Sequence, residues 1–225
     1  MTRLKTKTRS ESVTEQIRDL ILREELKPGG HLQELPLAEA LGVSRTPVRI
    51  ALSNLANEGI LDYRPKRGFV VREFKVSDII DAWQMRAWLE GLAALKATEH
   101  GLTKEGQARM IELVAEGDRI LSVGKLRPED VDAYRDMNVQ LHDIIIRAAR
   151  SPILEGAIRR TLAIPMVSHR MIPWDDFEHI KRTHGDHHRL LEAMLAGEAW
   201  RAEAIMREHV YSGTRLLENM RLGIA

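Results

Sequence analysis

The sequence contains no cysteine, so it can form neither a disulfide bond nor a thiolate metal site. It also lacks an apolar run of about 18 residues, the length that crosses a membrane as a helix. Residues 1–7 are polar and lack the apolar stretch of a secretory signal peptide. Aromatic residues are scarce, but 44% of the residues are hydrophobic, which is typical of a folded chain rather than a disordered one. These features predict a soluble, cytoplasmic protein of one large or two modest domains.

The net charge is only +1, but the charge is unevenly distributed along the chain. Residues 1–75 contain 14 lysines and arginines against 10 acidic residues, a net +4, and residues 76–225 contain 20 against 23, a net −3. A basic smaller part beside a mildly acidic larger part suggests that residues 1–75 face a polyanion. Taken alone, the same excess of four charges also fits an ordinary solvated surface.

Apolar spacing and helix breakers in residues 1–75 predict a winged helix-turn-helix. Apolar residues recur at helical spacing in the first stretch, and a Pro-Gly-Gly sequence at residues 28–30 ends it. Pro36 suits the first turn of a second helix, and Gly42 marks the tight turn before a third helix that Ser44 can cap. In chain order we expect helices over residues 12–26, 34–41 and 44–58, then strands over 60–63 and 69–71. A helix, a turn, a helix and a basic hairpin form this motif.

The sequence GVSRTPVR at residues 42–49 places several DNA-binding side chains at the start of the third predicted helix. The first turn of a helix that enters the major groove is where side chains meet base edges and backbone amides meet phosphates. Arg45 can bind guanine O6 and N7, and Ser44 and Thr46 can donate to phosphate or base. Arg49 lies one turn further on the same helix face.

The predicted hairpin carries Lys66, Arg67 and Gly68 at its tip. These two cations can reach the DNA backbone or the minor groove, and Gly68 permits a close approach. Arg45 or Arg49 considered singly would more simply be a surface charge on a small helical domain. The whole ordered motif, including the hairpin, favours a DNA-binding unit over residues 1–75.

Residues 13–71 resemble the N-terminal domain of GntR-family bacterial transcription regulators. The resemblance rests on the PG turn, the run LAEALGVSRTPVR and the helix end ALSNLANEGI, which leads to the KRG hairpin tip. It implies that Ser44, Arg45, Thr46, Arg49 and Gly68 contact operator DNA. Some relatives place a further basic residue on the second helix, where this chain has Leu35 and Pro36. Position 50 is Ile where the family commonly has Glu, and we interpret this as a packing or surface change.

From Val76 onward the sequence is helical in pattern, with few β-rich runs. Helices are expected over residues 78–100, 103–123, 128–149, 151–171, 176–196 and 198–219, with Ser77 and Thr103 as caps and Pro128 in a first turn. A break is expected at residues 172–175. The sequence therefore predicts an antiparallel bundle of six to seven helices over residues 76–225, and a mainly α protein as a whole.

Three histidines and an asparagine in this part are spaced to meet inside the predicted bundle. Asn138 and His142 lie four residues apart on one helix face. His187 and His209 are 22 residues apart, with the Ala196–Gly197 turn near the midpoint, so a rise of about 1.5 Å per residue brings them level across a helical hairpin. If the helix that carries residues 138 and 142 packs against this hairpin, three imidazoles and an amide oxygen meet inside the bundle. Such a set can bind a borderline divalent metal and leave coordination positions open.

The same part resembles the all-helical FCD effector domain of FadR-like GntR regulators. The matching stretches are MRAWLEGLAALKA (85–97), NVQLHDIIIRAARSPIL (138–154) and HHRLLEAMLAGEAWRAEAIMREHV (187–210). The resemblance implies that Asn138, His142, His187 and His209 hold a divalent metal, Zn²⁺ with Ni²⁺ or Mn²⁺ as alternatives. The first ligand is usually Asp, so its replacement by Asn138 leaves the ion with its full charge. The alternative is that the chain has lost the metal and binds its effector through the histidines directly.

Arg86 has two interpretations. It lies four residues before Glu90 and can form a helical ion pair. The FCD resemblance implies instead that it binds the carboxylate of an effector.

His184 and His188 flank His187 in the sequence. They are expected at the surface or rim of the bundle rather than among the metal ligands.

The sequence as a whole predicts an effector-responsive transcriptional regulator, a repressor rather than an activator, and not an enzyme. We expect a homodimer, since two-fold symmetry doubles the contacts on a palindromic operator in double-stranded DNA. The expected effector is a small carboxylate that lowers operator affinity from the C-terminal domain. Two alternatives are a metal-dependent hydrolase fused to a DNA-binding domain, and a sensor for which the metal itself is the signal.

Overall fold

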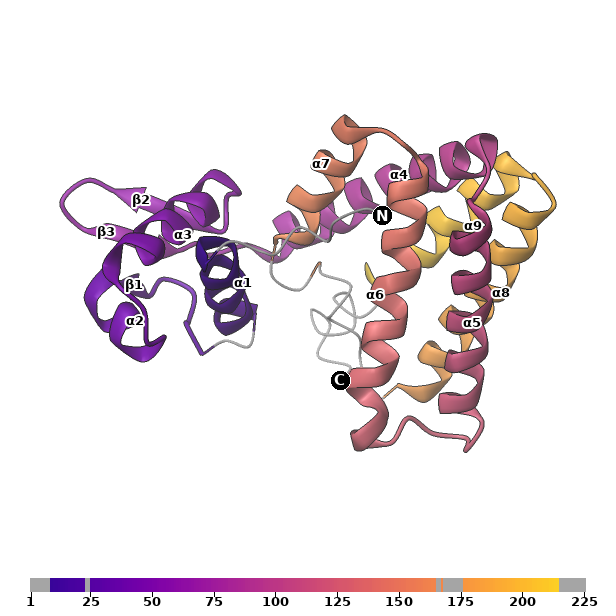
Figure 1. The fold of residues 1–225 in the computed structure, drawn as a ribbon, viewed down its shortest axis with the longest axis horizontal. Coiled ribbons are helices and arrows are strands. Elements are labelled where there is room, and N and C mark those ends of the chain that lie inside the picture. The colour runs from indigo at the N-terminus through magenta and orange to yellow at the C-terminus, as the bar shows by residue number, and fades with distance from the viewer. Residues whose placement is uncertain (1–8, 23–24, 165–166, 168–175, 215–225) are drawn as a thin grey trace. The chain divides into compact units, whose positions relative to one another are not determined.

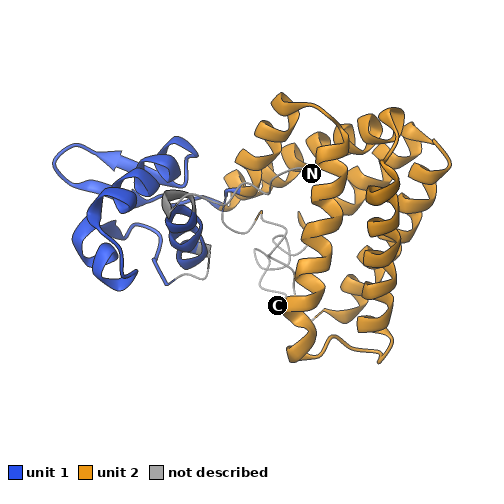
Figure 2. Cartoon of the chain, in the orientation of Figure 1, with its two compact units in different colours: residues 1–75, 163–166 blue, residues 76–162, 167–225 orange. Residues whose placement is uncertain are grey.

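The computed structural model describes residues 9–22, 25–164, 167 and 176–214. Contacts divide the chain into two compact units, residues 1–75 with 163–166 and residues 76–162 with 167–225 (Figure 2). The fold is mainly α-helical with one small sheet, which confirms the predicted class. Over the part of the chain that the structure describes, every helix is too short or too polar to cross a membrane.

The first unit is a winged helix-turn-helix (Figure 1). Its elements are α1 (Arg9–Leu22), β1 (His31–Leu32), α2 (Glu34–Ala40), α3 (Arg45–Asn57), β2 (Leu61–Arg64) and β3 (Gly68–Val71). The three strands form an antiparallel sheet in the order β1-β3-β2. Two sequence predictions were wrong in detail. The first helix ends at Leu22 rather than residue 26, and the two-residue strand β1, paired with Phe69 and Val70, was not predicted.

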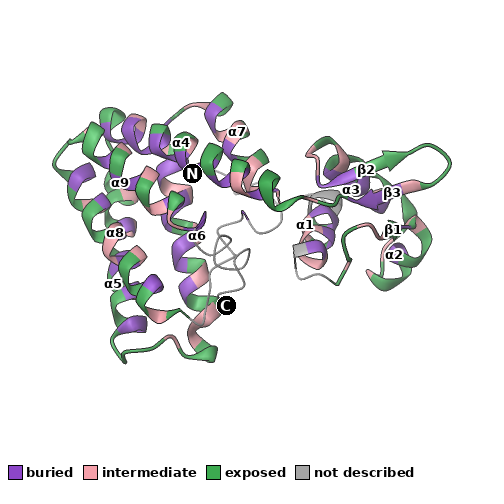
Figure 3. Ribbon diagram, turned by 180° about the vertical axis from the view of Figure 1, so that it is seen from behind, coloured by how far each residue is buried: buried purple, intermediate pink, exposed green. Residues whose placement is uncertain are grey.

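The apolar residues predicted to face inward on the third helix do so. Val48, Ala51, Leu52 and Leu55 are fully buried, against a core that also contains Ile17. Figure 3 shows α3 buried on one side and exposed on the other. Since core packing orients one face of α3, the opposite face and the N-terminal turn stay exposed to solvent.

The second unit contains six α-helices within its described residues, as predicted. They are α4 (Val76–His100), α5 (Lys104–Leu121), α6 (Val131–Ala148), α7 (Pro152–Leu162), α8 (Phe177–Leu195) and α9 (Ala199–Tyr211), with a short 3-10 turn, η1 (Pro128–Asp130), before α6. Thr103 caps α5 as predicted, accepting a hydrogen bond from the Gly106 amide.

Some predicted helix ends in this unit were wrong. Ser77 lies inside α4, which begins at Val76, so it does not cap that helix. The fourth predicted helix ends at Leu162 instead of near residue 171. The helix α9 is assigned over Ala199–Tyr211, and both the helix end expected at residue 219 and the break expected at 172–175 lie outside the described residues.

The packing of the bundle brings α4, α6, α8 and α9 around a common interior. The longest helix, α4, packs along α9 and also contacts α6, α7 and α8, while α8 and α9 form a hairpin about the turn at Gly197. Gly91 allows α4 and α9 to approach closely, because a Cβ there would lie 3.2 Å from the Glu203 carbonyl oxygen. Polar side chains that these helices turn inward therefore meet each other rather than water.

Candidate metal centre and nucleic-acid interface

The exposed N-terminus of α3 presents the hydroxyl and arginine side chains that were predicted to bind DNA. Ser44 occupies the N-cap position with an extended backbone, but its hydroxyl makes no capping hydrogen bond to the described residues. Ser44, Arg45, Thr46 and Arg49 are all exposed. The first turn of α3 holds no carboxylate, so its free backbone amides and arginines together favour an anion.

Arg45 has one weak intramolecular partner. Its Nη2 lies 3.3 Å from Oε2 of Glu34, at the start of α2, while 65% of the Arg45 side chain stays exposed. An exposed pair of this kind contributes about 0–1 kcal/mol. The guanidinium can therefore leave Glu34 for a nucleic-acid ligand at little cost. Leu35 and Ile50 are exposed, so the substitution at position 50 is a surface change.

The hairpin between β2 and β3 carries the second group of predicted DNA-binding residues. Its turn is closed by a hydrogen bond from the Arg67 amide to the Arg64 carbonyl, and both Lys66 and Gly68 have positive φ angles, 66° and 76°. Lys66 and Arg67 are exposed at the tip, and an edge-on contact between Tyr63 and Phe69, 5.2 Å between ring centroids, braces the strands behind it. The turn thus holds two cations away from the core.

Three of the four predicted metal ligands meet inside the second unit. His142 on α6, His187 on α8 and His209 on α9 can each direct a ring nitrogen to one point, with these atoms within 4.8 Å of one another. Nε2 of His142 lies 3.2 Å from Nε2 of His209, and the rings of His187 and His209 are 4.8 Å apart between centroids. The predicted register across the α8–α9 hairpin is therefore present. Asn138 lies one turn before His142 on α6 and is buried.

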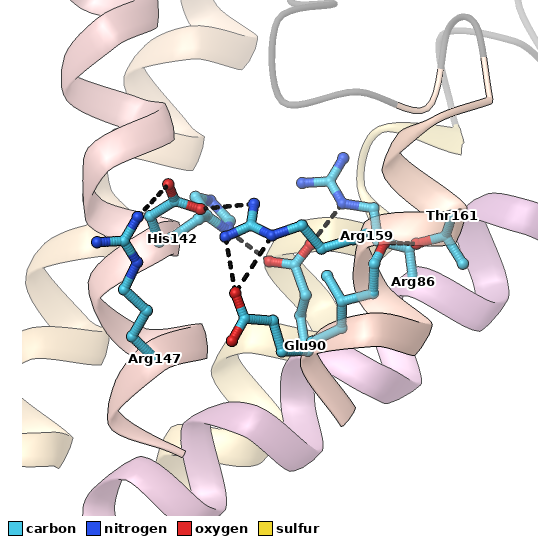
Figure 4. Close-up of polar contacts among 9 residues, drawn as sticks. Arg86, Glu90, His142, Arg147, Arg159 and Thr161 are labelled. Atoms are coloured by element: carbon cyan, nitrogen blue, oxygen red, sulfur yellow. Dashed lines mark hydrogen bonds and ion pairs between the residues drawn. The ribbon is translucent and has the colours of Figure 1, made fainter. Parts of the chain in front are cut away.

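Arg86, Glu90 and His142 form a buried polar network (Figure 4). It engages Nδ1 of His142, here called the outer nitrogen because Nε2, the inner nitrogen, faces His209. Oε2 of Glu90 lies 2.5 Å from Nδ1 of His142, and Oε1 accepts from Nε of Arg86 at 2.6 Å. Arg86 also donates from Nη1 to the Val167 carbonyl at 2.8 Å and stacks on Trp83. The ion pair of Arg86 with Glu90 is thus present, and it fixes the orientation of the His142 ring.

Burial favours the neutral form of the His187 and His209 imidazoles. Nδ1 of His209 lies 3.8 Å from Oδ2 of Asp186, an ion-pair distance rather than a hydrogen bond. Burial, followed by repulsion from His209, holds the pKa of His187 well below its usual value, and burial likewise lowers the pKa of His209. Neutral imidazole is the form that binds metal.

The donor set fits a divalent metal. Nε2 of His187 is buried and has no hydrogen-bond partner in the described part of the chain, while its Nδ1 contacts His184. A carboxylate on the outer nitrogen of a ligating histidine, as Glu90 provides for His142, is the usual support of a protein metal site. The available Nε2 of His187 can serve as a metal ligand, and the Glu90 carboxylate can support His142 as another.

Several residues near the histidines were missed or misjudged from the sequence. Glu90 was seen only as a partner of Arg86, and Asp186 and Asp118 were not considered. His184 was expected at the surface or rim, but it is buried beside His187 and Asp118. The i, i+4 spacing of His184 and His188 was an available signal for a shared helix face.

Comparisons with known proteins match both units. The family described as "Bacterial regulatory proteins, gntR family" matches residues 9–71, and the FCD domain matches residues 81–212. The chain is 29% identical to the "Probable D-xylose utilization operon transcriptional repressor" of Paenarthrobacter nicotinovorans, over 88% of this chain and 86% of that protein. It is also 29% identical to the "Uxu operon transcriptional regulator" of Escherichia coli K12, over 90% and 84%. The solved structure of E. coli McbR/YncC has the same fold, with a TM-score of 0.76 and 24% identity over 96% of this chain and all of that one.

Proposed function

The chain belongs to the GntR family of bacterial regulatory proteins and carries an FCD domain, and we propose that this transcriptional regulator is a repressor controlled by a small carboxylate effector. Residues 1–75 bind the operator and residues 76–225 bind the effector and a second protomer. Effector binding acts through the segment after β3, residues 72–75, and lowers operator affinity. The relative from Paenarthrobacter nicotinovorans is named as a repressor, which supports this direction of control. As a regulator of bacterial genes, the protein acts in the cytoplasm.

DNA binding is assigned to Ser44, Arg45, Thr46 and Arg49 on α3 and to Lys66, Arg67 and Gly68 on the hairpin. The support is the exposure of all these residues except the half-buried Gly68, the carboxylate-free first turn of α3 and the loose Arg45–Glu34 pair. In this arrangement Arg45 and Arg49 read base edges in the major groove, while Lys66 and Arg67 neutralise phosphates.

The active form is a homodimer on a palindromic operator. One recognition helix and one hairpin contact too few base pairs for useful specificity, and two-fold symmetry doubles that number. The surface of α4 supports this assembly, because Met85, Trp88 and Leu92 lie at i, i+3 and i+7 on one helix face and are all exposed. Such an apolar stripe on a helix is suited to packing against a second copy.

Within the effector domain, Asn138, His142, His187 and His209 would hold a divalent ion, Zn²⁺ with Ni²⁺ or Mn²⁺ as alternatives. A bound ion would supply positive charge and open coordination positions for the carboxylate of the effector. All four protein ligands are neutral, so that charge is undiminished. Arg86 is the proposed second anchor for the carboxylate. Its Nε and Nη1 are engaged by Glu90 and Val167, so the effector would meet the Nη2 edge of the guanidinium.

The hydrolase alternative is not favoured, because the matched relatives are named as transcriptional regulators. The carboxylates near the histidines are also engaged elsewhere. Glu90 lies between Arg86 and the outer nitrogen of His142, and Asp143 pairs with Arg159 at 3.2 Å. A general base would have to face the inner side of the cluster.

Operator binding by the purified, EDTA-treated protein tests the proposal. An operator is first selected from random duplexes, and its affinity is then measured by fluorescence anisotropy with and without Zn²⁺ and a panel of small carboxylates. We expect one class of carboxylate to lower the affinity only when Zn²⁺ is present. Dependence on Zn²⁺ alone would support the metal-sensor alternative, and a carboxylate response without metal would support direct binding to the histidines.

The matched variants are Arg45→Ala with Arg49→Ala, and Arg147→Ala on the exposed surface of the second unit as the control. The double variant should lose selective operator binding, and the control should retain it. Tight, selective binding by the double variant would overturn the assignment of α3 as the recognition helix.

A further inference from the structure

A second cluster of metal-binding side chains lies beside the three central histidines. It consists of Asp118 on α5 and His184 and His188 on α8, whose donor atoms all lie within 4.8 Å of one another. Oδ1 of Asp118 is 3.1 Å from Nε2 of His184 and 2.8 Å from Nε2 of His188. The two histidines are four residues apart, so they share one face of α8 and direct the same ring nitrogen toward the same carboxylate oxygen.

The backbone of α5 is shaped around one of these rings. A Cβ on Gly117 would lie 2.1 Å from Cε1 of His184, so any other residue at this position would displace the imidazole. The ring of His184 is buried, and Tyr134 makes an edge contact with it at 6.0 Å between centroids. By contrast, about half of the Asp118 and His188 side chains is exposed. One ligand is thus fixed in the bundle, and the other two open the site to solvent.

We propose that Asp118, His184 and His188 form a second divalent-cation site, separate from the central histidines. Two imidazoles and one carboxylate are a donor set for Zn²⁺ and similar borderline ions, and the open side leaves coordination positions for water. The competing explanation is a hydrogen-bonded clamp, in which Asp118 accepts from Nε2–H of both histidines and ties α5 to α8. The clamp needs no ion, so metal binding separates the two explanations.

The second site is linked to the central one through a single proton. Nδ1 of His184 lies 3.3 Å from Nδ1 of His187, so one of the two nitrogens must donate and the other must accept. A histidine that binds metal through Nε2 carries its proton on Nδ1. When His187 binds an ion through Nε2, its Nδ1–H donates to Nδ1 of His184. The proton of His184 must then be on its Nε2, which is the atom that the second site needs as a metal ligand. An ion in the central site disfavours an ion in the second site, and the reverse.

Isothermal titration of the EDTA-treated full-length protein with Zn²⁺ tests the second site. We expect wild-type protein to bind two ions per chain, the second more weakly. Asp118→Asn and His188→Ala change surface side chains, and each should remove the weaker phase and retain the tight one. Asp81→Asn and His100→Ala, exposed residues on α4, are the matched controls and should bind as wild type. If neither Asp118→Asn nor His188→Ala alters the isotherm, the site is overturned and the clamp is supported.

The linkage is tested with His209→Gln, which removes a central ligand and leaves the His184–His187 pair intact. Circular dichroism confirms that this variant is folded. In wild type, an ion in the second site has to break the hydrogen bond between His184 and His187 that the central ion has fixed. Without a central ion this cost is absent, so the ion at the second site of His209→Gln should bind roughly tenfold more tightly than the second ion of wild type. Unchanged affinity would refute the linkage. If the central metal site proposed above does not exist, wild type binds one ion that Asp118→Asn abolishes and His209→Gln does not affect.

Discussion

Replacing Glu90 by glutamine is expected to weaken metal binding at the central histidines without changing any ligand. Glu90 accepts from Arg86 Nε with one oxygen and contacts His142 Nδ1 with the other, at 2.6 and 2.5 Å. Glutamine has one acceptor and one donor group. Since Arg86 can only donate, the amide oxygen must face it, and the amide nitrogen then donates to Nδ1 of His142. The proton of His142 moves to Nε2, the nitrogen that would bind the ion.

The expected loss follows from this tautomer change and from burial. Changing the partner on the outer nitrogen of a ligating histidine costs about 10–100-fold in metal affinity, or roughly 1.4–2.7 kcal/mol. Arg86 and Glu90 are both buried, so the guanidinium is left without a counter-charge, at a cost of about 3–5 kcal/mol of unfolding free energy. For a protein of this size that corresponds to a fall of roughly 6–20 °C in Tm.

Two measurements separate the effects. Zn²⁺ titration of EDTA-treated protein gives the affinity, and the ¹⁵N chemical shifts of the imidazole nitrogens give the tautomer of His142. Glu112→Gln, on the exposed side of α5, is the control and should leave both unchanged. A Glu90→Gln protein that binds Zn²⁺ within threefold of wild type while His142 keeps its proton on Nδ1 would refute the role assigned to Glu90.

Three further predictions concern the two units separately. Arg45→Ala should weaken operator binding by about 1–3 kcal/mol per half-site and relax specificity at one base pair. Lys66→Ala should reduce the slope of log affinity against log salt concentration by about 2 for a dimer, measured by anisotropy. Equal effects on all sequences from both variants would contradict the assignment. Without metal, stability should fall as pH drops below about 6.5, by up to about 1.4 kcal/mol per pH unit for each of His187 and His209, because their lowered pKa values let the unfolded chain take up protons first. Thermal melts in EDTA from pH 8 to 5.5 check this, and a flat profile would disprove it. Asn138→Asp should tighten Zn²⁺ binding and weaken carboxylate binding, since it lowers the net charge at the ion; titrations in which both affinities move together would rule this out.

Local sequence signals predicted most of the elements because the interactions behind them are local. The third helix begins after Ser44 and ends at Asn57, as its cap position and the glycine at 59 indicated. The strand β1 escaped prediction because two residues carry no pattern, and only pairing with Phe69 and Val70 makes them a strand. The helix α7 ends earlier than expected, at Leu162, because apolar spacing alone does not mark where a helix stops.

For the candidate site, helical periodicity in the sequence placed Asn138 and His142 on one helix face, and the short turn at Gly197 brought His187 and His209 level across a hairpin. Whether the α6 face meets that hairpin was decided by tertiary packing, because the contact of His142 with His209 spans 67 residues. Only the tertiary structure decided their outer partners. Glu90 could be paired with Arg86 from its spacing, but its contact with His142 spans 52 residues. His184 was likewise expected near the surface. Its ring is instead buried, because Gly117 on α5 has no Cβ to occupy the same space. The physical reason is that periodicity orients a side chain within its own helix, whereas its partner and its exposure depend on how closely other helices pack against it.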